Sequence, residues 1–182
     1  MMKEFSLFLN MIKPDLPSVP PFYQGYVHLV KDVDLFDNLE QSMVLTQQLL
    51  NNITESQGSY AYAPGKWTIK ELLCHMIDAE RIFCYRALRF ARNDQTPLHG
   101  FEEKDYAPEA NADNRTVVSI AAELKRLRMT TIDLYRSFTP DMLERTGTAN
   151  NTRLSVRNLG FIISGHETHH RKILSDRYLT KG

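Results

Sequence analysis

Apolar residues recur at helical spacing through four stretches of this 182-residue chain, and no segment shows the alternation of apolar and polar residues typical of a half-buried strand. The best-marked stretch is "WTIKELLCHMIDAERIFCYRALRFAR", residues 67–92. Thr68 and Glu71 are spaced for a capping box directly before its apolar stripe, which predicts where a helix begins. Four such helices can bury their apolar faces only by packing on one another.

The other three predicted helices have comparable lengths. They run from an N-cap at Asp34 to about Thr54, along a seam from Ile120 to Leu134, and from about Thr152 to about Tyr178, with one short helix between Pro140 and Gly147. Residues 1–33, in which four prolines lie between positions 14 and 21, are predicted to form an extended arm over the body. We therefore predict an all-α four-helix bundle with long crossover connections, in a single domain covering residues 1–182.

The composition argues against several classes of partner. Lysine plus arginine equals aspartate plus glutamate at 22 each, so the chain has no broad positive field for nucleic acid. No apolar run approaches the roughly 20 residues that a membrane span requires. Cys74 and Cys84, the only two cysteines, are ten residues apart on one predicted helix, about 15 Å along its axis, and cannot bridge each other. We expect a reducing, cytoplasmic location with no nucleic-acid or membrane partner.

Three of the six histidines fall within "GHETHHRKIL", residues 165–174. At about 100° per residue, His166 and His170 lie on the apolar stripe of the last helix, and His169 lies nearer its edge. Two imidazoles at positions i and i+4 stand one above the other and can hold one metal ion. Two core histidines bonded to backbone or water are the alternative, and this pattern alone leaves both interpretations open.

The same letters contain H-E-x-x-H, the motif of zincin proteases, because Glu167 follows His166. Two observations disfavour a protease. The third zincin ligand lies well downstream of the helix, and the residues after His170 offer no obvious candidate. Glu167 is also turned about 100° from His166, which directs it off the inward stripe. The sequence assigns no catalytic role to Glu167 or His169.

A third ligand must come from elsewhere in the chain. His75 is the candidate, and Asp78, one turn later, could orient its imidazole as a hydrogen-bond acceptor. A border histidine and a surface ion pair are the alternatives for these two side chains. His28 and His99 lie in coil-like segments and are disfavoured as ligands. Glu80 projects from the middle of an apolar face, which predicts an ion pair with an arginine of another helix.

Three segments together resemble the DinB/YfiT-like superfamily, specifically its DinB-like branch. They are "PGKWTIKELLCHMIDAERIFCYRALRFAR", "GFEEKDY" and "SVRNLGFIISGHETHHRKILSDRY", and the likeness extends over nearly all of the chain from residue 25 onward. The resemblance implies a four-helix bundle with long crossovers, a homodimer, and a divalent metal ion held by His75, His166 and His170. Cys74 stands where many members have glycine, which affects the packing beside His75 but leaves the three ligands intact.

Members of this family include thiol transferases as well as metal-dependent hydrolases and isomerases. The first hypothesis is a transferase that joins a low-molecular-weight thiol to an electrophilic small molecule, because a metal ion lowers the pKa of a thiol bound to it. A metal-dependent hydrolase, or a bundle that binds a metal or small molecule without catalysis, is the alternative. Imidazole ligands favour zinc or nickel, with iron or manganese next. Tyr26, Glu103, Arg86 and Tyr106 are expected to line the substrate pocket, unless packing or surface charge explains them.

Overall fold

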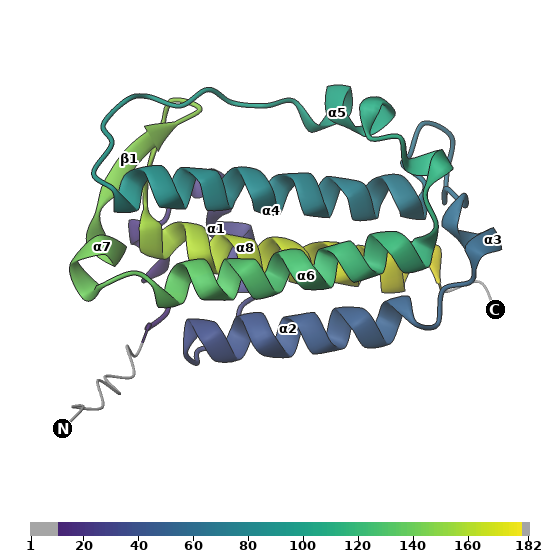
Figure 1. Ribbon diagram of the computed structural model, residues 1–182, viewed down its shortest axis with the longest axis horizontal. Helices are drawn as coiled ribbons and strands as arrows, with labels where there is room; N and C mark the ends of the chain where they lie inside the picture. The colour runs from purple at the N-terminus through teal and green to yellow at the C-terminus, as the bar shows by residue number, and fades with distance from the viewer. Residues whose placement is uncertain (1–10, 180–182) are drawn as a thin grey trace.

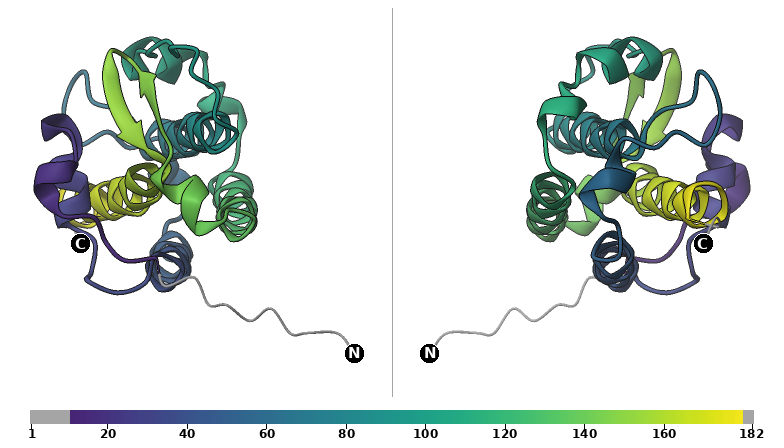
Figure 2. Two further views of the ribbon diagram at one scale, coloured as in Figure 1. Left: turned by 90° about the vertical axis from the view of Figure 1, so that its left-hand side faces the viewer. Right: turned by 90° about the vertical axis from the view of Figure 1, so that its right-hand side faces the viewer.

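The computed structural model describes residues 11–179, and the first ten residues of the predicted arm lie outside this range. Four long helices form the bundle: α2 (Leu35–Leu50), α4 (Ile69–Ala91), α6 (Val117–Arg136) and α8 (Val156–Ile173) (Figure 1). Seen end-on, α4 lies next to α6 and α8, and α2 closes the square between α6 and α8 (Figure 2). The predicted four-helix bundle is therefore confirmed, with a small two-stranded sheet added to it.

The predicted starts of α2 and α4 are confirmed. The Asp34 side chain accepts a hydrogen bond from a backbone N–H of the first turn of α2, and Thr68 opens a complete capping box at α4. The predicted end of α2 near Thr54 is wrong. The helix ends at Leu50 because Thr54 caps a separate short helix, α3 (Glu55–Gly58), with a capping box of its own.

A β-hairpin stands where the sequence predicted the beginning of the last helix. Strands β1 (Thr146–Ala149) and β2 (Thr152–Ser155) pair in antiparallel fashion. Asn150 and Asn151 between them have φ values of 48° and 56°, as a two-residue hairpin turn of type I′ requires. The expectation of no strand is wrong because four-residue strands are too short to show a clear alternation. α8 accordingly begins only after β2.

The connection from α4 to α6 crosses the bundle as predicted, but it is not a plain loop (Figure 1). It contains α5 (Glu103–Glu109), which packs against α4, and the 3-10 turn η2 (Ala112–Asn114). The short helix predicted before the last long one is α7 (Pro140–Glu144). It ends before Gly147, which belongs to β1.

The N-terminal arm is helical where it contacts the bundle. α1 (Pro21–His28), preceded by the 3-10 turn η1 (Leu16–Ser18), lies along α8. Proline opens α1 without penalty because the first turn of a helix leaves that N–H unbonded in any case. The expectation of an arm without regular structure is therefore wrong for these residues. The contact is close, since a Cβ added at Gly165 would stand 2.1 Å from the Tyr26 carbonyl oxygen.

Two apolar clusters fill the two ends of the bundle, and a polar layer lies between them along α2, α4, α6 and α8. We define the polar layer as the buried side chains Ser42, Thr46, Glu80, Arg128, Thr131, His166, Glu167 and His170, together with half-buried His75. Cys74 and Cys84 are unbridged, as predicted. Among the described residues, no helix combines the length and the apolar character that crossing a bilayer requires.

Candidate metal centre

Three imidazoles meet in the polar layer: His75 from α4, and His166 and His170 from successive turns of α8. Their Nε2 atoms are 3.2 Å (His75 to His166), 3.2 Å (His75 to His170) and 3.1 Å (His166 to His170) apart. The structure thus brings together the three histidines expected as ligands. The four-residue spacing puts two of them on one face of α8, and the packing of α4 against α8 adds the third.

Hydrogen bonds among the three rings do not explain this arrangement. Each Nε2 carries either a proton or a lone pair, so among three mutually adjacent Nε2 atoms at least two must be alike and repel each other. A single cation facing three lone pairs removes that conflict. Two nitrogens bound to one zinc ion at about 2.0–2.1 Å and roughly 100° apart would stand about 3.2 Å from each other, close to the separations in this cluster. The donor set therefore fits one divalent metal ion.

The three rings are neutral near pH 7. Burial is the largest cause that lowers the pKa of His75 to about 4 and that of His170 to about 2. Burial, and then the neighbouring imidazoles, lower the pKa of His166 well below its usual range. Neutral imidazole is the form that binds a metal ion, so these lone pairs are available without prior loss of a proton.

Aromatic rings surround the cluster. Trp67 packs on the His75 ring with 4.8 Å between centroids, and Tyr26 lies edge-on to His166 at 5.3 Å. His169 is half-buried at the edge of the cluster, as its place on the stripe predicts, and its ring centroid is 5.0 Å from that of His170. The Nδ1 atom of His170 is buried without a hydrogen-bond partner in the described part of the chain. An environment this apolar strengthens the attraction between the nitrogens and a cation.

The orienting role expected of Asp78 is not found. Asp78 forms an ion pair with Arg81 at 3.7 Å, and no hydrogen bond links it to His75 within residues 11–179. It lines a separate cavity of about 460 Å³ together with Cys74 and Tyr106. Tyr106 therefore lines a different cavity from the one that reaches the histidines.

A buried ion cluster occupies the rest of the polar layer. Arg128 of α6 donates two hydrogen bonds of 2.8 Å to Glu80 of α4 and a third to Glu167 of α8. The interhelical ion pair predicted for Glu80 is confirmed. Burial alone would lower the pKa of the guanidinium, but the two carboxylates outweigh it and raise the pKa. Arg128 was not among the residues predicted from the sequence, although its spacing from Leu124 and Thr131 puts it on the apolar stripe of α6.

Glu167 contacts α2 and α6 instead of the histidines. Burial raises the pKa of this carboxyl, but Arg128 and the hydroxyls of Ser42 and Thr46 outweigh that effect and lower the pKa. A carboxylate held by three fixed donors cannot reach a substrate at the cluster. The structure thus agrees with the rejection of a zincin protease.

A cavity of about 460 Å³ opens at His170, within the roughly 300–1,000 Å³ of typical ligand sites. Trp67 and Tyr178 line it, and so does Glu103 of α5, as expected for this residue. Arg86 does not: its guanidinium is buried and donates to a backbone carbonyl of the crossover at 3.1 Å. The cavity thus borders the histidine cluster at His170.

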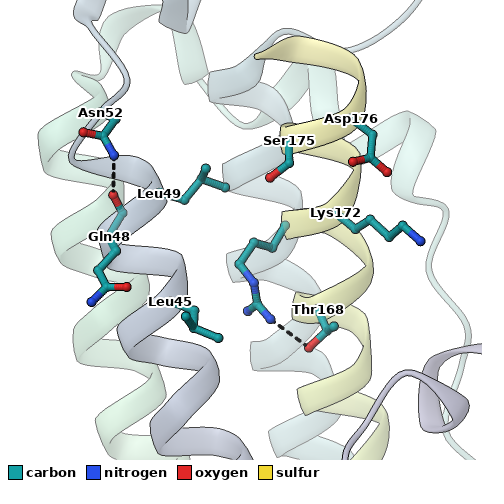
Figure 3. A pocket seen from close by; sticks show the side chains of 9 residues that line it. Leu45, Gln48, Leu49, Asn52, Thr168, Lys172, Ser175 and Asp176 are labelled. Atoms are coloured by element: carbon teal, nitrogen blue, oxygen red, sulfur yellow. Dashed lines mark hydrogen bonds between the residues drawn. The ribbon is translucent and has the colours of Figure 1, made fainter. Parts of the chain in front are cut away.

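A second cavity, of about 560 Å³, lies between α2 and α8 (Figure 3). Leu45 and Leu49 line it from α2, and Thr168 and Lys172 line it from α8. None of the three clustered histidines is among its lining residues. The cavity at His170 is therefore the one that suits chemistry at the cluster.

Comparison with known proteins reveals the family. The sequence profile of the DinB superfamily matches residues 38–174. A protein of Oceanobacillus iheyensis, whose name assigns it provisionally to the metal-dependent hydrolases, is 24% identical over 144 residues, covering 75% of this chain and 81% of the relative.

Two solved structures share the fold. YfiT from Bacillus subtilis, described as a probable metal-dependent hydrolase with an unusual four-helix bundle topology, has a TM-score of 0.70 at 19% identity, covering 78% of this chain and 82% of YfiT. A mycothiol-dependent maleylpyruvate isomerase has a TM-score of 0.62 at 11% identity, covering 91% of this chain and 63% of the isomerase. At these identities the likeness concerns the fold alone. The family profile, however, spans the bundle from α2 to α8, and the chain belongs to the DinB superfamily.

Proposed function

We propose that this protein is a metal-dependent enzyme in which His75, His166 and His170 hold one divalent ion beside a cavity for a small-molecule substrate. The observation that carries the proposal is the set of three neutral Nε2 atoms, 3.1–3.2 Å apart, where that cavity opens. The names of the relatives support it, since two refer to metal-dependent hydrolysis and one to dependence on mycothiol. Zinc or nickel suits three imidazoles best, followed by iron or manganese.

Within this class we favour a low-molecular-weight thiol S-transferase. His75, His166 and His170 would hold the ion, which would supply Lewis acidity and so lower the pKa of a thiol or of water. Glu103 lines the cavity with His170, and we propose that its carboxylate receives the thiol proton. The sulfur then bonds to the electrophilic carbon as the leaving group departs with its electron pair. Hydrolysis, with water in place of the thiol, is the alternative that uses the same residues.

Metal content tests the site. Untagged protein is expected to contain about one divalent ion per chain, and His75→Ala and His170→Ala are each expected to lose it, because two imidazoles hold an ion far less tightly than three. His169→Ala is the matched control and should retain the ion. Wild-type protein that is free of metal and also fails to take up zinc or nickel would refute the proposal.

Turnover separates the reactions. The protein is incubated with a panel of low-molecular-weight thiols and a model electrophile, and separately with ester substrates lacking any thiol. A thiol-dependent rate that chelation abolishes supports the transferase, whereas a chelator-sensitive rate without thiol supports the hydrolase. Bound metal with no turnover in either assay would favour a bundle that binds its ion without catalysis.

The resemblance to the family also supports a homodimer. Light scattering of the purified protein should then give about twice the 21.1 kDa of one chain. A mass equal to one chain at all concentrations would contradict this expectation.

A further inference from the structure

The cavity beside the histidine cluster has an aromatic wall that contacts within the chain hold in place. The Tyr178 hydroxyl donates to the Trp67 carbonyl oxygen at 2.7 Å, and Tyr62 meets Tyr178 edge-on with 4.9 Å between ring centroids. Trp67 packs in turn on the His75 ring. Tyr178 belongs to η3 (Leu174–Tyr178), a π-helical turn that continues α8, and such turns often occur at functional sites. The wall is thus continuous with the surroundings of the cluster.

Two lysines whose ammonium groups have no partner line the same cavity. Lys66 and Lys104 are exposed, and the side chain of neither forms a hydrogen bond or an ion pair with any residue that the structure describes. Lys70, by comparison, pairs with Glu55. Glu103 is the one acidic side chain among the lining residues, so two cations and one anion leave the lining with a net charge of +1.

We propose that this cavity binds an aromatic carboxylate, with its ring against Tyr62, Trp67 and Tyr178 and its carboxylate at Lys66 and Lys104. A planar ring gains from stacked and edge-on contacts with such a wall, and unpaired ammonium groups attract a carboxylate. The proposal that this carboxylate binds in the cavity is independent of the function proposed above. Only the further step, that it is a substrate, rests on that function. Because low-molecular-weight thiols also carry carboxylates, the test includes a carboxylated thiol without a ring.

The binding assay needs no added label. Trp67 is the only tryptophan of the chain, so its fluorescence reports directly on the cavity. The full-length protein, with its metal content measured, is titrated with 3-phenylpropionate, and then with 3-phenylpropanol, butyrate and 3-mercaptopropionate as matched compounds. We expect 3-phenylpropionate to change the emission saturably and to bind about tenfold more tightly than each of the other three, because it alone offers both the ring and the charge to the wall and the lysines.

Lysine variants test the charge. Lys66→Gln combined with Lys104→Gln is expected to weaken the binding of 3-phenylpropionate about tenfold and to leave that of 3-phenylpropanol unchanged. Lys172→Gln, in the cavity between α2 and α8, is the matched control and should leave both unchanged. Equal affinity for the acid and the alcohol, or full affinity in the double variant, overturns the carboxylate assignment. Butyrate or 3-mercaptopropionate binding as tightly as 3-phenylpropionate overturns the aromatic assignment.

Metal analysis of the same samples separates this result from the proposed function. If the protein holds its ion but does not bind 3-phenylpropionate, the ligand class is refuted while the metal centre stands. If it binds 3-phenylpropionate through the two lysines but takes up no metal, the ligand site is supported and the metalloenzyme is refuted.

Discussion

At the scale of single side chains, the polar layer combines two clusters of opposite character. The three histidines are uncharged, their Nε2 atoms lie close together, and one of them, His170, lines a cavity. Arg128, by contrast, is saturated by Glu80 and Glu167 and is only 1% exposed. Only the histidine cluster has free capacity for a ligand, which separates the candidate site from a group that serves the fold.

The lowered pKa values of His75 and His170 predict how the metal-free protein responds to acid. Below the ordinary histidine pKa of about 6.5, these two imidazoles bind protons in the unfolded chain. In the folded protein the same rings stay unprotonated down to about pH 4 or lower. The free energy of unfolding should therefore fall as the pH drops from 7 to 5, as measured by urea denaturation. His170→Gln should make this fall shallower. If the free energy of unfolding of His170→Gln depended on pH as it does in the wild type, the conclusion that His170 is buried in its neutral form would be contradicted.

The buried ion cluster predicts a large penalty when the guanidinium at its centre is removed. Arg128→Met leaves the buried carboxylates of Glu80 and Glu167 without the cation that is hydrogen-bonded to both, and we expect it to lower the free energy of unfolding by about 3–5 kcal/mol. Arg136→Met is the matched control, because Arg136 lies on the same helix in an exposed ion pair with Glu40, and it should cost less than about 1 kcal/mol. Chemical denaturation measures both. Similar losses in the two variants would count against a stabilising role for Arg128.

At the scale of elements, local signals were predictable and close approaches between elements were not. The start of α4 followed from the capping box at Thr68, and the i, i+4 spacing put His166 and His170 on one face. The hairpin was missed because its pairing depends on two adjacent residues with positive φ, Asn150 and Asn151, rather than on a long apolar pattern. The sequence of α8 does not reveal which helix packs against it, so from the residues alone His75 was only a candidate ligand. The family resemblance supplied the complete set of three expected ligands.

The contact between α1 and α8 predicts opposite effects for two glycines. At Gly165 a Cβ would meet the Tyr26 carbonyl oxygen at 2.1 Å, so Gly165→Ala must push α1 away, and we expect a loss of about 1–3 kcal/mol in unfolding free energy. At Gly25 nothing lies within 4 Å of an added Cβ, so Gly25→Ala should be neutral or stabilise α1 by up to about 1 kcal/mol. Thermal melts of both variants provide the comparison. If Gly165→Ala left the free energy of unfolding unchanged, α1 would not be held tightly against α8.

At the scale of the whole molecule, the two apolar clusters make the bundle predictable as a class, because four amphipathic helices must share a core. The polar layer that divides this core was not predictable as a unit. Its members come from four helices. The role of a single buried residue such as Arg128 becomes clear only from its hydrogen-bond partners on α4 and α8. The candidate metal centre is part of that layer, so its integrity depends on the packing of the entire bundle.

Removal of the metal should therefore lower the stability of the whole bundle. An ion present at about one hundred times its dissociation constant adds about 2.7 kcal/mol to the folded state, which corresponds to roughly 5–10 °C in Tm for a chain of this size. Chelation of wild-type protein should lower its Tm by this amount, and added zinc should restore it. His75→Ala should show no response to the chelator. A chelator effect of equal size in that variant would locate the stabilising ion elsewhere.

His75 and His166 are 91 residues apart in the chain. During synthesis on the ribosome, the first of these proposed ligands emerges long before the other two exist, and even the complete unfolded chain offers no preformed triad. Under the proposed function, the three nitrogens would reach the spacing that holds an ion only once α8 has docked against α4. Selection among competing cellular metals would accordingly rest with the folded protein, whose geometry discriminates, and not with the nascent chain, where the ion with the highest intrinsic affinity for imidazole would win.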